Sequence, residues 1–273
     1  MNQPGSASPL QPGEQARRGE SRVAFFGGSF DPPHLGHLAV ARAARAAFRL
    51  DSVLFAPVGV QPLKPEGPAA SFEQRLAMTR LAIEGEPGFE VSLADAPKPS
   101  GRYDLAPNYT IDTLEGLRAG LAPECALFCL MGADSFFGLR RWHRAAEIPF
   151  VAPLIVASRP GQPLAGLKAA LPSGLTLEPA PRGDKTESGV ELRAFALVNQ
   201  AGDRAPFYLL PGLYVEISAS EIREAIGCQN HADAKGFIAT KNLLPPPVAG
   251  YIRSYGLYQF SGFKGQVSGG KDH

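Results

Sequence analysis

The sequence predicts an α/β fold built on a doubly wound parallel sheet, with a small helical part near the C-terminal end. Short apolar runs typical of buried strands alternate with longer segments whose apolar residues recur at helical spacing. Residues 23–26 and 52–58 are two such runs, and the alanine-rich segment 37–48 between them is typical of a helix, which gives a β-α-β unit. Glycine-rich or polar loops follow the strands, and ligands of such sheets bind beyond the carboxyl ends of the strands.

The remaining elements continue this alternation. Ser71 to Gln74 has the capping-box pattern that opens a helix, and the Pro-, Gly- and Asn-containing segment up to Asn108 is typical of a loop. The helices expected after the first unit are 72–84, 110–119, 220–226 and 246–255, and the expected strands are 89–93, 125–131, 151–157, 207–210 and 213–217.

The chain is expected to hold one domain, residues 22–258, between two tails. Residues 1–21 are rich in Pro, Gly, Ser and Gln and contain no aromatic residue, which is typical of a disordered tail. Residues 259–273 are rich in glycine and are expected to be flexible. Within the domain, residues 160–206 contain many prolines and glycines with weak periodicity, so we expect an irregular excursion there with at most one short strand.

Composition argues against several classes of function. The 273 residues carry a net charge of +1, with Lys+Arg 27 against Asp+Glu 26, so no general attraction to nucleic acid or membranes is expected. No apolar run reaches the roughly 18 residues of a membrane span, and the first twenty residues lack an apolar signal core. Three cysteines, an odd number, argue against a disulfide framework, and Cys125 and Cys129 are expected to be buried in a strand. A cytoplasmic location is therefore expected, while the oligomeric state stays open.

The stretch GGSFDPPHLGHL, residues 27–38, joins the first strand to the first helix. Gly27 and Gly28 lack a Cβ, so a ligand can approach the backbone closely, and the N–H groups of the loop and helix start attract anions. His34 and His37 are three residues apart, which places both imidazoles on one side of a first helical turn. The stretch does not end in the G-K-[ST] of a P-loop, and it does not match the G-x-G-x-x-G pattern of a dinucleotide-binding loop. It predicts a junction whose histidines donate hydrogen bonds to phosphate; the alternative is a turn with two surface histidines.

Further candidate residues follow the other strands. Lys64 lies in the loop after the second strand, where it either faces a polyphosphate or is an ordinary solvated lysine. Asp134 can accept hydrogen bonds from ribose hydroxyls or cap a helix. Trp142, the only tryptophan, lies among charged residues and either stacks on a flat ring or belongs to the core. Arg159, after the fourth main strand, is placed to reach phosphate.

Several segments together resemble one family. The histidine loop is similar to the (H/T)xGH signature of the nucleotidyltransferase superfamily, and its fuller form resembles bacterial nicotinate mononucleotide adenylyltransferases. That family has segments similar to NYTIDTL (108–114), GAD (132–134), LRRWHR (139–144), ISASEIR (217–223) and LLPPPV with YI (243–252), in the same order. Leu63 stands where the family has a histidine before the lysine, and Ala219 and Ser220 stand where it has serine and threonine.

The resemblance extends over residues 22–258 and implies a Rossmann-like fold and a reaction. The implied reaction is attack by the 5′-phosphate of nicotinate mononucleotide on the α-phosphate of ATP, giving deamido-NAD and pyrophosphate in NAD biosynthesis. Mg²⁺ would be held mainly by the ATP phosphates, with no metal motif in the protein and no nucleic-acid partner. The alternatives are a related transferase acting on nicotinamide mononucleotide or phosphopantetheine, and a nucleotide-binding regulator without catalysis.

The resemblance also implies roles for single residues. The implied catalytic residues, which would bind the ATP phosphates and the leaving pyrophosphate, are His34, His37, Lys64 and Arg223. The residues implied to bind ATP are Gly27, Gly28, Ser29, Phe30, Gly132, Asp134, Arg159, Ser218, Ser220 and Ile222. The residues implied to bind nicotinate mononucleotide are Thr110, Trp142 and His143, with backbone N–H groups near Thr110 and His143 holding the carboxylate.

Overall fold

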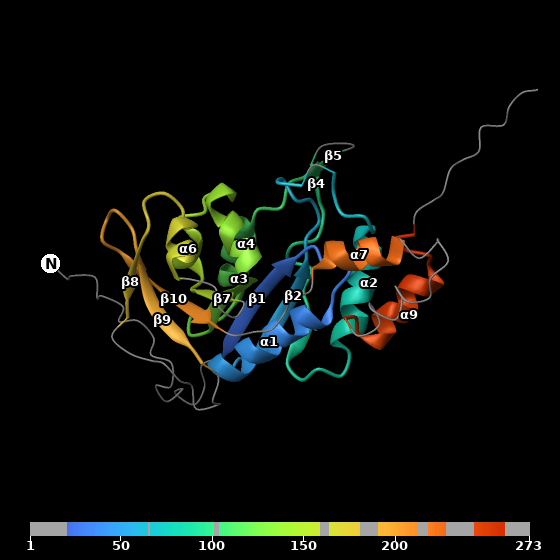
Figure 1. Cartoon of the computed structure of the whole chain (residues 1–273). Helices are drawn as coiled ribbons and strands as arrows, with labels where there is room; N and C mark the ends of the chain where they lie inside the picture. Colours follow the sequence, from blue (N-terminus) through green and yellow to red (C-terminus); the bar gives the residue numbers. More distant parts are fainter. Residues whose placement is uncertain are drawn as a thin grey trace, which may run out of the picture.

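The computed structural model describes residues 21–64, 66–100, 104–158, 164–180, 191–211, 218–227 and 243–259. An eight-stranded sheet forms the centre of this part of the chain (Figure 1). Its strands, in spatial order, are β3 (Phe89–Val91), β2 (Ser52–Pro57), β1 (Arg22–Gly28), β6 (Ala126–Gly132), β7 (Leu154–Ala157), β10 (Arg204–Leu210), β9 (Arg193–Val198) and β8 (Thr176–Pro179). Two short strands, β4 (Lys98–Ser100) and β5 (Asp104–Ala106), pair separately.

The strand order identifies a doubly wound sheet. β1 pairs in parallel with β2 on one side and with β6 on the other, and β6, β7 and β10 continue in parallel. The chain thus builds outward from β1 in both directions, which creates a topological switch point between β1 and β6. The predicted Rossmann-like α/β fold is confirmed, with β9 and β8 added as antiparallel strands at one edge.

Helices cover both faces of the sheet in two layers. One layer consists of α1 (Leu35–Phe48), α2 (Phe72–Ile83), α7 (Ala219–Gly227) and α9 (Pro246–Ser254). The other consists of α3 (Thr110–Gly120), α4 (Ala133–Gly138), the 3-10 helix η1 (Leu139–Arg141), α5 (Ile148–Val151) and α6 (Leu164–Ala169). Successive side chains of β1 point to opposite faces of the sheet. Ala24 and Phe26 therefore pack against the first layer of helices, and Val23 and Phe25 pack against the second.

The helix boundaries agree with their sequence signals. The capping box predicted at the start of α2 is present: the Gln74 N–H donates to Ser71 Oγ at 3.3 Å, and the Ser71 N–H donates to Gln74 Oε1 at 3.0 Å. Helix α1 ends at Phe48, as predicted, because Arg49 adopts the left-handed conformation with φ 49°. Cys125 and Cys129 are buried free thiols, also as predicted.

Two predicted irregular segments contain regular structure. Residues 160–206 hold α6, β8, β9 and the first residues of β10, so the prediction of an irregular excursion was wrong for the described part. β9 pairs with β10 and β8 pairs with β9, and strand formation depends on such neighbours more than on local pattern. The loop before Asn108 likewise contains the paired strands β4 and β5. The strand predicted at 213–217, residues 1–20 and residues 260–273 lie outside the described residues.

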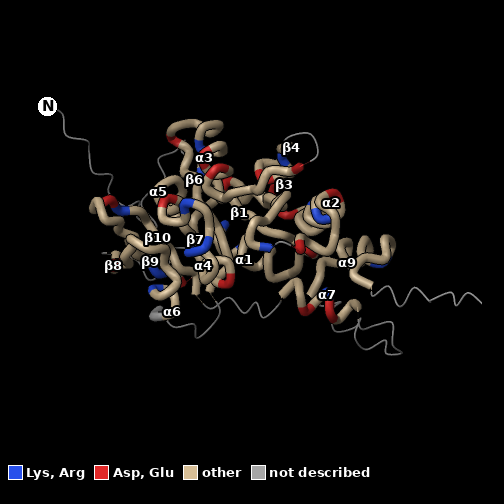
Figure 2. Tube along the Cα trace, turned by 90° about the horizontal axis from the view of Figure 1, so that it is seen from above, with Lys and Arg blue, Asp and Glu red and all other residues tan. Residues whose placement is uncertain are grey.

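Charge is distributed over the described surface without a strong bias. Figure 2 shows lysine and arginine interspersed with aspartate and glutamate along the chain, in keeping with the net charge of +1. Among the described residues, no helix combines the length and the apolar character needed to cross a membrane.

Candidate active site

A cavity of about 800 Å³ lies at the carboxyl ends of β1 and β6, where the strand order reverses. Its wall brings together the loops after β1, β2 and β6 with the starts of α3 and α7. The predicted site residues that line it are Gly27, Gly28, Ser29, Phe30, His34, His37, Lys64, Thr110, Gly132, Asp134, Trp142, His143, Ser218, Ser220 and Arg223. Segments up to about 200 positions apart in the sequence therefore meet at this cavity.

The two glycines that end β1 lie close to aromatic rings. A Cβ at Gly27 would lie 2.7 Å from the Phe25 ring, and a Cβ at Gly28 would lie 3.3 Å from the Phe30 ring. Phe30 has a left-handed backbone with φ 47°, which turns the chain away from the strand toward α1. Gly27 to Phe30 all line the cavity.

His34 and His37 face each other at the start of α1. Their ring centroids are 3.7 Å apart, and the ring planes are inclined by 32°. The His34 backbone N–H donates to His37 Nδ1 at 3.1 Å. Because Nδ1 of His37 is an acceptor, its neutral ring carries the proton on Nε2, which makes Nε2 a donor. The prediction that both imidazoles lie on one side of the first turn agrees with this geometry.

Both imidazoles are neutral in the unliganded protein at pH 7. Burial lowers the pKa of His34 to about 4. Burial, together with the nearby His34, lowers the pKa of His37 well below its usual value. His34 Nδ1 is buried and has no hydrogen-bond partner within the described residues. An anion bound beside these rings would raise both pKa values, because it favours the charged form.

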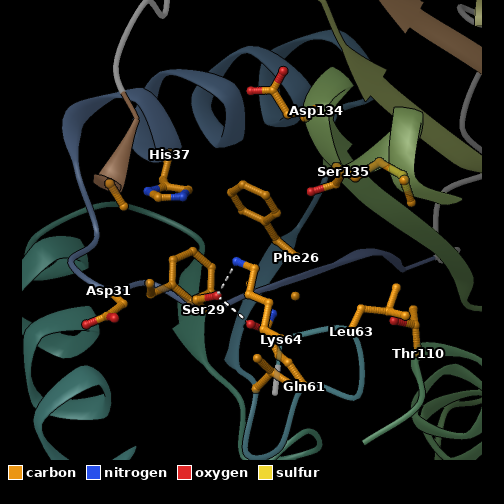
Figure 3. Close-up of a pocket in the computed structure, with 18 of the residues that line it drawn as sticks. Phe26, Ser29, Asp31, His37, Gln61, Leu63, Lys64, Thr110, Asp134 and Ser135 are labelled. Atoms are coloured by element: carbon orange, nitrogen blue, oxygen red, sulfur yellow. Dashed lines mark hydrogen bonds between the residues drawn. The ribbon is translucent and has the colours of Figure 1, made fainter. Parts of the chain in front are cut away.

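Lys64 and Ser29 connect the loops after β1 and β2. Lys64 Nζ donates to Ser29 Oγ at 3.4 Å, and Ser29 Oγ donates to Gln61 Oε1 at 2.9 Å (Figure 3). Lys64 is exposed, so its ammonium group can turn toward an anion in the cavity. Leu63, which replaces the histidine expected from the resemblance, is 47% exposed and lies on the Thr110 side of the cavity in Figure 3.

Arg223 and two serines lie at the start of α7. Ser218 is the capping residue, because its Oγ accepts the Glu221 N–H at 3.1 Å. Arg223 donates from Nη2 to Ser220 Oγ at 3.2 Å and from Nη1 to the Asp31 carbonyl at 2.7 Å. The guanidinium group is therefore held beside the loop that follows β1.

One predicted ATP-binding residue, Ile222, is not brought to the cavity. Ile222 is completely buried in the core, and its N–H donates to the Ser218 carbonyl at 3.1 Å. The apolar face of α7 packs on the sheet, which turns Ile222 inward, so its assignment as a ligand-contacting residue is corrected. Arg159 lies outside the described residues.

The far side of the cavity is formed by α3 and the turn after η1. Thr110 is the first residue of α3, where backbone N–H groups lack partners within the helix. The rings of Tyr109 and His143 stack with centroids 4.4 Å apart. Trp142 is partly buried against the core and lines the cavity, while its backbone N–H donates to the Leu139 carbonyl at 2.8 Å.

Sequence reasoning missed several buried polar residues that hold these loops. Arg75 is 1% exposed and donates to the carbonyls of Ser29 at 2.7 Å and Val58 at 2.8 Å. Asn108 accepts the Val60 N–H at 2.8 Å. Arg75 lies on the same helix face as Met78 and Ala82, but its burial was not predicted because arginine is rarely buried.

Comparison with known proteins identifies the family. The cytidylyltransferase-like family matches residues 25–225. A probable nicotinate-nucleotide adenylyltransferase of Sodalis glossinidius is 35% identical over 242 residues, which cover 87% of this chain and 97% of that protein. One from Laribacter hongkongensis is 38% identical over 237 residues, 87% of this chain and 94% of that protein. This chain belongs to the nicotinate-nucleotide adenylyltransferase family.

Solved structures agree with the fold of this family. The Plasmodium falciparum nicotinic acid mononucleotide adenylyltransferase complexed with NaAD superposes with a TM-score of 0.58 at 16% identity, covering 88% of this chain and 98% of that chain. A putative nicotinate-nucleotide adenylyltransferase from Vibrio parahaemolyticus gives a TM-score of 0.51 at 17% identity, covering 88% of this chain and 97% of that chain. The family resemblance and the Rossmann-like fold predicted from the sequence are both confirmed.

Proposed function

We propose that this protein transfers the adenylyl group of ATP to nicotinate mononucleotide, giving deamido-NAD and pyrophosphate, as an enzyme of NAD biosynthesis. The observation that carries the proposal is the paired His34 and His37 at the β1/β6 switch point of a chain belonging to this family. The cavity of about 800 Å³ is in the size range of small-molecule sites, which suits two nucleotides meeting end to end. ATP as the donor favours a cytoplasmic setting.

The phosphates of ATP would bind on the side of the cavity that carries the positive and donor groups. His37 Nε2, the Lys64 ammonium group and the Arg223 guanidinium group all come from segments that line this side. His34 stacks on His37 and supports its orientation. Fixed donors aimed at developing charge stabilise the transition state without reorganising when the reaction occurs.

Positioning and charge stabilisation are sufficient for this reaction. The 5′-phosphate of the acceptor is already anionic at neutral pH, so its oxygen attacks the α-phosphorus directly and the P–O bond to pyrophosphate breaks. Because both histidines start neutral, the approaching polyphosphate raises their pKa values and favours the imidazolium forms. Ring N–H groups, which donate even in the neutral form, would stabilise the charge that develops on the leaving pyrophosphate.

The rest of ATP would lie across the switch point. The backbone of Gly27 to Phe30 would contact the nucleotide closely, since these residues line the cavity. Gly132 and Asp134 line it at the end of β6, where a carboxylate can accept hydrogen bonds from ribose hydroxyls. Ser218 and Ser220 would add contacts at the start of α7.

Mg²⁺ would enter the site on ATP. The described residues contain no group of three or more His, Cys, Asp or Glu side chains arranged to hold a metal ion. The oxygen ligands of the ion would come mainly from the phosphates and water, as Mg²⁺ prefers. When bound, the ion would neutralise part of the phosphate charge.

The nicotinate ring would bind between α3 and the turn after η1. Trp142 offers a flat surface for the ring, and the backbone N–H groups near Thr110 and His143 suit a carboxylate, which only accepts hydrogen bonds. A carboxamide would turn its NH₂ group toward one of these donors. The acid is therefore the expected substrate.

Pyrophosphate release by the purified protein with ATP, Mg²⁺ and either mononucleotide tests this proposal. Charge-assisted hydrogen bonds contribute about 1.5–3 kcal/mol, so kcat/KM for the nicotinate form should exceed that for the nicotinamide form by roughly 10- to 100-fold. Trp142→Ala should weaken both substrates alike, because stacking does not distinguish them. Equal kcat/KM values would indicate dual specificity, and no pyrophosphate with either substrate would contradict the proposed reaction.

A further inference from the structure

Asp31 is a buried carboxylate at the edge of the cavity, directly after Phe30. Its side chain is 3% exposed, and three donors surround it. The Ala69 N–H donates to Oδ2 at 2.6 Å, the Ala70 N–H donates to Oδ1 at 3.1 Å, and the Tyr258 hydroxyl donates to Oδ1 at 2.7 Å. Figure 3 shows Asp31 on the side of His37 and Ser29, opposite Thr110.

Arg223 rests on the same residue. Its Nη1 donates to the Asp31 main-chain carbonyl at 2.7 Å and lies 3.9 Å from Asp31 Oδ2. Its Nη2 donates to Ser220 Oγ at 3.2 Å, and the side chain, which is 31% exposed, lines the cavity. Asp31 and Ser220 therefore contact this positive charge from two sides.

Tyr258 reaches Asp31 from the turn that follows α9. This turn is anchored by the Leu257 N–H, which donates to the Ile252 carbonyl at 3.0 Å. Helix α9 itself packs against α2 and contributes Val248 and Ile252 to the same core cluster. The turn after α9 therefore contacts the loop after β1 through the hydrogen bond from Tyr258 to Asp31, two residues that are 227 positions apart in the sequence.

We propose that Asp31 and Tyr258 are positioning residues for the phosphate side of the site. Tyr258 fixes the Asp31 carboxylate, and Asp31 fixes both the Arg223 guanidinium group and the segment at Ala69 and Ala70, downstream of Lys64. The inference rests on the proposed function, in which Arg223 binds the ATP phosphates. Immobilising an arginine side chain costs conformational entropy. If Arg223 is already held in position before ATP binds, this cost does not reduce the affinity for ATP.

A double-mutant cycle with Arg223 separates positioning from simple structural support. If Tyr258 acts through Arg223, removal of its hydroxyl should reduce activity when Arg223 is present and have little further effect once Arg223 is alanine. A residue that only stabilises the fold would reduce activity to the same degree in both backgrounds. The cycle comprises wild type, Tyr258→Phe, Arg223→Ala and the double variant, with Tyr255→Phe as the matched control, because Tyr255 is 61% exposed.

Steady-state kinetics of pyrophosphate release and the melting temperature are measured for each protein. Misplacing a catalytic group by about 1 Å can cost up to roughly 100-fold, so we expect Tyr258→Phe to lower kcat/KM for ATP by roughly tenfold. KM for nicotinate mononucleotide should stay within about twofold of wild type, since its proposed site lies on the other side of the cavity. Tyr255→Phe should match wild type.

Asp31→Asn provides the second variant, because an amide NH₂ in place of Oδ2 would face the Ala69 N–H. We expect Asp31→Asn to lower kcat/KM for ATP more than Tyr258→Phe does, and to do so only when Arg223 is present. If this variant fails to fold, the double-mutant cycle with Tyr258 decides alone. Equal losses with and without Arg223, or unchanged kinetics in Tyr258→Phe, would overturn the inference. A wild type without any pyrophosphate release would overturn the proposed function as well, so the two failures are distinguishable.

Discussion

At the residue scale, the proposed chemistry depends most on His37, whose Nε2–H faces the phosphates in the proposed complex. Loss of one preorganised donor lowers kcat by roughly 10²–10³. His37→Ala should therefore reduce turnover by this factor while the melting temperature stays close to that of wild type. His37→Gln, which keeps a donor group, should lose less. A folded His37→Ala protein with near-normal turnover would contradict the assignment.

We expect His34 to make the free energy of unfolding depend on pH, in the range between its pKa in the unfolded chain and its pKa in the folded protein. Burial lowers its pKa from 6.5 to about 4, so as the pH falls the unfolded chain takes up a proton before the folded protein does. The stability contributed by neutral His34 is complete above pH 6.5 and is lost toward pH 4, by about 3 kcal/mol.

Denaturant unfolding of wild type and His34→Asn at several pH values measures this effect. Asparagine is a favourable residue at a helix N-cap and does not titrate, so it removes the proton uptake and keeps the position polar. The variant should lose less stability than wild type between pH 6.5 and pH 4. Parallel pH profiles for the two proteins would show that His34 is not the group responsible.

At the element scale, the start of α2 matters for both stability and the site. The capping box of Ser71 and Gln74 precedes Arg75, whose guanidinium group holds the loops after β1 and β2. Ser71→Ala should lower the free energy of unfolding by about 1 kcal/mol, which corresponds to roughly 2–4 °C in melting temperature for a chain of this size. Calorimetry checks this value against Ser100→Ala, an exposed serine in β4 that should change little.

Elements with a strong local pattern were predictable, whereas the antiparallel strands β9 and β8 were not. The runs that became β1, β2 and β6 are continuously apolar, because helices cover both faces of the sheet at these strands. β9 and β8 lie at the edge and form by pairing with β10 and with each other, so their sequences carry a weaker signal. Prolines and glycines in 160–206 concealed these strands from sequence reasoning.

At the scale of the whole molecule, the composition of residues 1–20 predicts that they contribute little. Deleting residues 1–20 should change neither the melting temperature nor the rate of pyrophosphate release. Deleting residues 1–24 is the matched control, because it also removes Val23 and Ala24, which are 7% and 0% exposed in β1. That longer deletion should destabilise the protein clearly, and a comparable loss from the shorter one would show that the first twenty residues pack on the domain.

The sequence by itself determined the family, the order of the central elements and the residues around the histidine loop. Each of these depends on local information: apolar periodicity, a strand–loop–helix junction, or motifs a few residues long. Only the tertiary structure decided the strand order, the burial of Ile222 and Arg75, and the contact of Tyr258 with Asp31. The physical reason is that such contacts join segments up to 227 positions apart, so packing of the helical layers on the sheet creates them and no local pattern encodes them.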